Sequence, residues 1–86
     1  MKFVEKSDFT DPHAAARKLV EIANTVEAVQ DGRIYIELVN SSFLKVGGTP
    51  DQYRIALARA VTFGWLLLHE SGTYVKFTAA GAGLFA

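Results

Sequence analysis

Apolar residues recur every three or four positions along two long stretches of the chain, which is the spacing of an amphipathic helix. From Pro12 to about Gln30, the apolar positions on one helical face are Ala15, Leu19, Ile22, Val26 and Val29. From Pro50 to Phe63, they are Tyr53, Ala56, Leu57 and Ala60. We therefore predict helices over 12–30 and 50–63, each directing one face into a core.

The predicted helices also have end signals. Asp11 and Thr49 stand directly before the two prolines that open these helices, and their side chains can cap the first turn, where the missing N–H of proline costs nothing. The first helix is predicted to end at Asp31-Gly32, and Gly64 is predicted to form the turn that follows the helix over 50–63. A weaker helix is predicted between them, over 38–46.

Alternation of apolar and polar residues predicts short strands at 33–37 and in a hairpin over 65–77, with a two-residue turn at Ser71-Gly72. Pairing Glu70 with Thr73 places alternate residues on opposite faces of the hairpin. The face directed to the core would hold Leu66, Leu68, Val75 and Phe77. The outer face would hold Trp65, Leu67, His69, Tyr74, Lys76 and Thr78. Thr78 is also expected to cap a last short helix over 79–85.

Composition limits the classes of protein that fit the chain. It has 86 residues, half of them hydrophobic, which suffices for one small domain over 11–86 preceded by a tail or edge strand over 1–10. The absence of cysteine excludes a thiol nucleophile, a disulfide scaffold and a cysteine zinc site, and it suits a reducing cytoplasm. The N-terminus lacks the apolar run of a signal peptide, and the run from Trp65 to Leu68 is far short of the roughly 20 residues that span a membrane.

Three segments near the C-terminus carry a resemblance to a known family. Residues 60–66, 70–76 and 77–85 resemble the winged helix-turn-helix domains of bacterial transcription regulators, such as the multiple-antibiotic-resistance type. The last segment is similar to the hydrophobic-Thr-x-x-Gly-x-x-Leu ending of such wings. The resemblance implies an α+β fold with a three-helix core, a short leading strand and a C-terminal β-hairpin wing. Small bacterial proteins of about this length, which offer a fold and no assigned activity, are similar too.

The resemblance also implies that the helix over 50–63 enters the major groove of double-stranded DNA. The residues that it assigns to DNA binding are Gln52, Arg54, Arg59, Lys45, Ser41 and Lys76. Gln52 and Arg54 would read base edges through paired hydrogen bonds. Arg59, Lys45 and Ser41 would contact the DNA backbone, and Lys76 would reach the backbone or the minor groove. On this hypothesis the protein is a small transcriptional or nucleoid-type regulator that acts as a homodimer or with a second protein.

A second hypothesis is a protein–protein adaptor that uses the same fold without DNA. Nine basic against nine acidic residues give a net charge of zero, Glu70 places an acid at the wing tip, and Ile55 and Ala58 are apolar where polar readers are expected. The partner-binding residues would then be Ile55, Ala58, Trp65, Leu67 and Tyr74. The hairpin aromatics could also join Val20 in a partner surface, or pack on the tail through Phe3 or Phe9.

Catalytic and metal sites have weak support in the sequence. His69 and Glu70 are neighbours on a strand and point to opposite faces, so they cannot share a site, and we expect His69 to stack near Tyr74. Gly47-Gly48-Thr49 lacks the Lys-Ser/Thr ending of a nucleotide loop and is interpreted as a helix stop followed by a cap. Two distant histidines without cysteine make a zinc site improbable. We expect no cofactor and no enzymatic activity.

Overall fold

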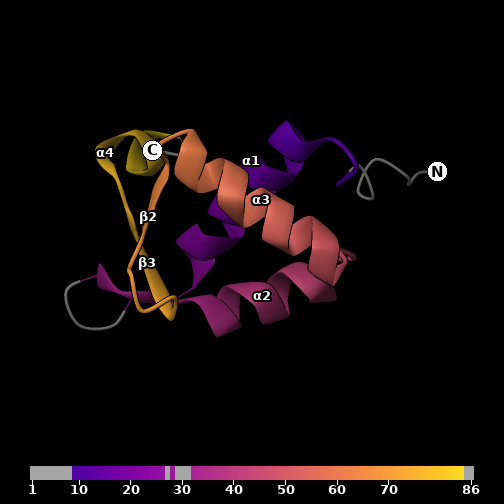
Figure 1. Cartoon of the computed structure of the whole chain (residues 1–86), viewed down its shortest axis with the longest axis horizontal. Coiled ribbons are helices and arrows are strands. Elements are labelled where there is room, and N and C mark those ends of the chain that lie inside the picture. The colour runs from indigo at the N-terminus through magenta and orange to yellow at the C-terminus, as the bar shows by residue number, and fades with distance from the viewer. Residues whose placement is uncertain (1–8, 27, 29–31, 85–86) are drawn as a thin grey trace.

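The computed structural model describes residues 9–26, 28 and 32–84, which form an α+β fold with a small open antiparallel sheet (Figure 1). The elements are α1 (Pro12–Thr25), β1 (Ile34–Tyr35), α2 (Ile36–Lys45), α3 (Pro50–Thr62), β2 (Leu66–Leu68), β3 (Tyr74–Phe77) and α4 (Ala79–Gly83). The hairpin and α4 lie together at one end of the described structure, and α3 lies across α1 (Figure 1). This arrangement is compatible with the winged-helix plan expected from the sequence.

The most extensive contact between elements of the described structure joins α1 to α3, and small side chains are buried on both helices. Three alanines of α1 and two of α3 are almost completely buried: Ala15, Ala16, Ala23, Ala56 and Ala60. A methyl group fills little space, so two helices that meet through alanines can approach closely. The inward faces predicted for both helices are confirmed at Ala15, Leu19, Ile22, Ala56 and Ala60, whereas Tyr53 and Leu57 are only half-buried.

Helix α1 is shorter than predicted. It ends at Thr25, and Val26 is already extended with φ −79° and ψ 130°. The N–H of Val26 still donates to the carbonyl of Ile22, which also accepts the Thr25 hydroxyl at 2.7 Å, so the last turn is closed by these two residues. The extension to Gln30 was therefore wrong, and Val29 lies outside the described residues. Val20 is fully buried, which excludes it from a partner surface.

The first strand is shorter, and the helix after it starts earlier, than the sequence predicts. In β1, Ile34 pairs with Val75 and Tyr35 with Tyr74. The N–H of Ile36 then donates to the carbonyl of Thr73 at 3.0 Å, which is the last bond to that strand before α2 begins. The boundary is therefore set by a partner almost forty residues away along the chain, which local alternation does not reveal.

The hairpin has the predicted register and a different turn. Leu66 pairs with Phe77, Leu67 with Lys76 and Leu68 with Val75. His69 donates its N–H to Tyr74 at 3.1 Å, so the turn spans residues 70–73 instead of Ser71-Gly72 alone. Leu68, predicted to face the core, is 40% exposed, whereas Leu66 of the same strand is buried as predicted.

The C-terminal helix is fixed to the exit of α3 through Thr78 and Gly81. The Thr78 hydroxyl is hydrogen-bonded to the carbonyls of Gly64 and, at 3.1 Å, Trp65, and its oxygen accepts the Gly81 N–H at 3.0 Å. The predicted cap is thus confirmed, with the helix ending at Gly83. Gly81 packs directly against the backbone of Trp65, since a Cβ on Gly81 would lie 1.9 Å from the Trp65 carbonyl oxygen.

We expect Gly81→Ala to lower the free energy of unfolding by at least about 1–3 kcal/mol, because the added methyl group would displace backbone instead of a flexible side chain. Gly83→Ala is the matched control, since no heavy atom lies within 4 Å of a Cβ at that position. Urea unfolding of both variants measures the difference. Equal stability of the two variants would contradict the contact between α4 and Trp65.

Candidate nucleic-acid interface

Helix α3 presents one continuous exposed face, which we call the α3 outer stripe. Its members recur at helical spacing and are all exposed: Asp51, Arg54, Ile55, Ala58, Arg59 and Thr62. The buried Ala56 and Ala60 lie on the opposite side of the helix. The stripe brings Arg54 and Arg59 onto the same exposed face as the apolar Ile55 and Ala58.

Gln52, expected to read adenine, is engaged in the cap of α3. Its N–H donates to the Thr49 hydroxyl oxygen at 3.1 Å, and its side-chain oxygen accepts the Thr49 N–H at 3.0 Å, which completes a capping box. Paired recognition of adenine needs both the oxygen and the nitrogen of the amide. Gln52 would therefore have to give up a cap bond in order to read a base. The same bonds confirm that Thr49 is a helix cap.

Arg54 is paired within its own helix. Its Nη2 lies 2.7 Å from Oδ1 of Asp51, and the two side chains are 73% and 78% exposed. Exposed pairs of this kind contribute at most about 1 kcal/mol. A phosphate or a base edge can therefore replace Asp51 as the partner of the guanidinium at small cost. Arg59, in the last turn of α3, has no ion pair with any carboxylate in the described part of the chain.

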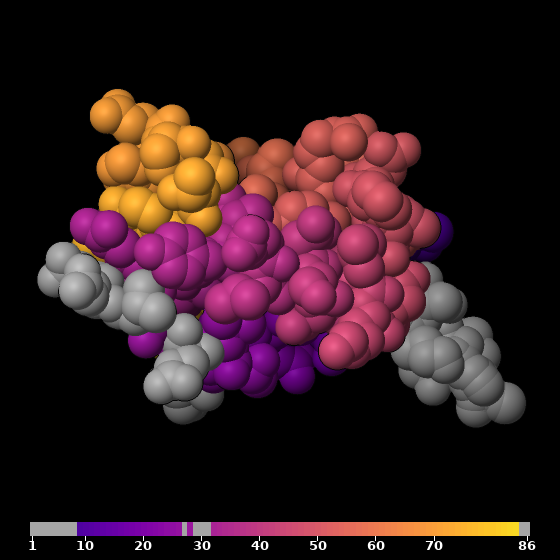
Figure 2. Space-filling view, turned by 90° about the horizontal axis from the view of Figure 1, so that it is seen from below, coloured from indigo at the N-terminus to yellow at the C-terminus, as the bar shows by residue number. Residues whose placement is uncertain are grey.

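The other expected DNA contacts lie on two further elements. Ser41 and Lys45 are exposed on α2, and Lys76 lies on the outer face of the sheet. In the space-filling view, α2 occupies the middle of one face of the molecule, with the hairpin on one side and α3 on the other (Figure 2). The six predicted residues are thus distributed over α2, α3 and β3.

The relative position of α2 and α3 depends on Phe43 and Tyr53. Phe43 is fully buried and packs against Tyr53, with ring centroids 5.8 Å apart, while the Tyr53 hydroxyl donates to the Ile36 carbonyl at 3.3 Å. A Cβ on Gly48 would lie 2.2 Å from the Phe43 ring, so the turn between the helices passes directly over that ring. Burial raises the pKa of Tyr53 to about 12.

The aromatic residues proposed for a protein partner separate into two groups. Trp65 lies with His13 and Phe63, at centroid distances of 5.6 and 4.9 Å. It therefore contacts the first turn of α1 and the exit of α3 instead of Tyr74. Phe9 does not cover the hairpin either, because it stacks on Phe43 at 4.9 Å, and Phe3 lies outside the described residues.

Tyr74 belongs to a stack that the sequence predicted only in part. The ring of His69 lies 4.5 Å from that of Tyr74 with an angle of 18° between the planes, which confirms the expected stacking. The Arg33 guanidinium lies 4.9 Å from the centre of the Tyr74 ring, and this contact was missed. It depends on the pairing of β1 with β3, a long-range contact. No local sequence motif indicates a contact of this kind.

Metal binding and membrane crossing find no support in the described part of the chain. No group of three or more His, Cys, Asp or Glu side chains there could hold a metal ion. None of the helices described has both the length and the apolar character needed to cross a bilayer. Comparison with known protein families found no matching family model, and comparisons with curated proteins and with solved structures found no match.

We expect the free energy of unfolding to fall between pH 10 and about pH 12 because of Tyr53. The pKa of Tyr53 is higher in the folded state, so the unfolded state binds fewer protons in this range and gains relative stability as the pH rises. The contribution of Tyr53 to the free energy of unfolding is fully present below pH 10. Tyr53→Phe should show a shallower fall in urea titrations at stepped pH, and Tyr35→Phe, at an exposed tyrosine, is the control. Identical slopes for the two variants would contradict the burial of the Tyr53 hydroxyl.

Proposed function

We propose that this chain is a winged-helix DNA-binding module that places α3 in the major groove of duplex DNA and acts as a transcriptional or nucleoid-type regulator. The observation that carries the proposal is the α3 outer stripe, which is exposed along the whole helix. The sheet order β1-β3-β2 supports it, because the strand before α2 pairs with the second strand of the hairpin, as a winged helix requires.

The charged residues of the α3 outer stripe give the proposed interface its chemistry. Arg54 exchanges its weak pair with Asp51 for a base edge, where a guanidinium can donate two parallel hydrogen bonds to guanine. Arg59 contacts a phosphate, and Ser41 and Lys45 of α2 supply further backbone contacts. Gln52 stays in the helix cap and stabilises α3 instead of reading a base.

A single domain that makes these few contacts would bind duplex DNA with low affinity. Arg59 and Lys45 together neutralise only a few phosphates, and the wing tip adds the negative charge of Glu70. Two copies on neighbouring half-sites would add their binding free energies. We therefore propose that the protein acts as a homodimer or with a second DNA-binding protein.

The exposed apolar residues favour a second candidate, a protein–protein adaptor. Ile55 is 46% exposed at the centre of the α3 outer stripe, and Leu38, Leu44 and Val46 are exposed on or directly after α2. Apolar groups on a helix face suit a protein partner better than a phosphate backbone. Light scattering after size exclusion, together with the duplex titration, distinguishes the candidates: a strict monomer that binds duplex excludes the adaptor.

We expect Arg59→Gln to weaken binding to mixed-sequence duplex DNA and to reduce the slope of log affinity against log salt by about one, because one phosphate contact is lost. Anisotropy titrations of a labelled duplex at several low salt concentrations measure both quantities. Lys18→Gln is the matched control, because it removes the same charge from α1, where Lys18 pairs with Glu21 at 3.4 Å. Absence of duplex binding, or equal slopes for the two variants, would contradict the role of α3.

A further inference from the structure

The outer face of the sheet carries cationic and planar side chains that the α3 outer stripe does not include. Ile34, Val75 and Leu66 are buried, so their strand neighbours point away from the core. Those neighbours lie in two cross-strand pairs, Tyr35 with Tyr74 and Leu67 with Lys76. We call this set, together with Arg33 and His69, the outer sheet face.

The planar groups of the outer sheet face are already oriented. His69 stacks on Tyr74, and the guanidinium of Arg33 lies over the same ring. Nδ1 of His69 accepts the N–H of Ser71 at 3.1 Å and lies 2.8 Å from the Ser71 hydroxyl, which fixes the plane of the imidazole. Groups that are held in place before binding lose little conformational entropy when a ligand arrives.

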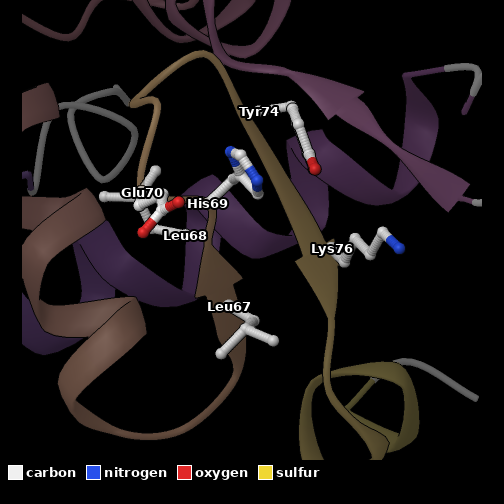
Figure 3. A pocket seen from close by; sticks show the side chains of 6 residues that line it. All are labelled: Leu67, Leu68, His69, Glu70, Tyr74 and Lys76. Carbon is white, nitrogen blue, oxygen red and sulfur yellow. The ribbon is translucent and has the colours of Figure 1, made fainter.

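Two planar surfaces beside Tyr74 are open to a ligand. Tyr35 is 38% exposed, and the His69 side chain is exposed as well. An open groove of about 380 Å³ is lined by residues of β2, β3 and the turn that joins them: Leu67, Leu68, His69, Glu70, Tyr74 and Lys76 (Figure 3). Leu67 is 63% exposed and gives the groove an apolar wall. Rings and an apolar wall of this kind suit a nucleobase.

The charges of the outer sheet face favour an anion. Neither Arg33 nor Lys76 forms an ion pair with a carboxylate among the described residues. Nε of Arg33 is buried and has no hydrogen-bond partner in the described structure. Glu70 is the acid that lines the groove, and its carboxylate lies on the opposite side of the groove from the Lys76 ammonium (Figure 3). The end of the groove at Lys76 is therefore positive.

We propose that the outer sheet face binds single-stranded nucleic acid, with bases stacked on Tyr35 and His69 and phosphates held by Arg33 and Lys76. A duplex keeps its bases stacked inside, where rings on a flat sheet cannot reach them, whereas a single strand can turn its bases outward. The cations stand on different strands, Arg33 beside β1 and Lys76 in β3, so they suit successive phosphates better than one free nucleotide. This site is separate from α3 and does not depend on duplex binding.

The test is an anisotropy titration of the whole protein with a labelled oligothymidylate of about 12 nucleotides, a length within the range that one small domain covers. We expect Lys76→Gln to weaken binding several-fold, and Tyr74→Leu, which removes the ring between Arg33 and His69, to weaken it about tenfold. Lys18→Gln on α1 should bind like the unchanged protein. Thermal melting of each variant, followed by circular dichroism, shows whether the fold is retained, and Lys76→Gln keeps the test valid if Tyr74→Leu unfolds.

Three outcomes would overturn the proposal. The first is no binding of the oligothymidylate at low salt. The second is a loss of oligothymidylate affinity in Lys76→Gln that is no larger than the loss in Lys18→Gln. This result would mean that the oligonucleotide does not contact the outer sheet face. The third is thymidine monophosphate binding as tightly as the oligonucleotide, which would replace the single strand by a free nucleotide. Duplex affinity of Lys76→Gln is measured in parallel, and a loss there equal to the single-strand loss would show one shared surface instead of two.

Discussion

The contact between α1 and α3 through buried alanines is the constraint on which the rest of the structure depends. Ala56 and Ala60 turn one side of α3 toward α1, and this orientation alone sends Arg54, Ile55 and Arg59 to the opposite side. A larger side chain at either alanine would have to move the helices apart, because interiors are packed without spare volume. The exposed stripe is thus a consequence of small residues on its reverse side.

The second determinant is the turn between α2 and α3. Phe43 fills the space under this turn. Only glycine fits at position 48, because a Cβ there would lie 2.2 Å from the Phe43 ring. Tyr53 then joins the first turn of α3 to the start of α2 through its hydroxyl. These contacts fix the position of Ser41 and Lys45 relative to α3, and the DNA contacts proposed for α2 and α3 depend on this arrangement.

The net charge is zero, but the charged residues are distributed unevenly over the surface of the described structure. Lys18 and Arg54 are paired within their own helices, whereas Arg59 lies at the end of α3 and Arg33 and Lys76 lie on the outer sheet face. Screening confines each charge to its neighbourhood, at about 8–10 Å under ordinary salt, so local groups govern binding more than the total does. Two surfaces of different chemistry follow: an α-helical stripe of arginine and apolar residues, and a sheet face of stacked rings with cations.

The sequence by itself determined the features that depend on local geometry. Helical periodicity, the Thr49 and Thr78 caps and the alternation in the hairpin gave the inward alanines, the outward arginines and the register of Leu66 with Phe77, since each is set by residues within one turn or one hairpin. Only the tertiary structure decided the end of β1, the exposure of Leu68 at a sheet edge and the place of Arg33 over Tyr74. The end of β1 and the place of Arg33 arise from the pairing of β1 with β3, and no local pattern indicates a contact between segments so far apart in the chain. The exposure of Leu68 depends on which elements pack against that end of the sheet, which local alternation does not specify either.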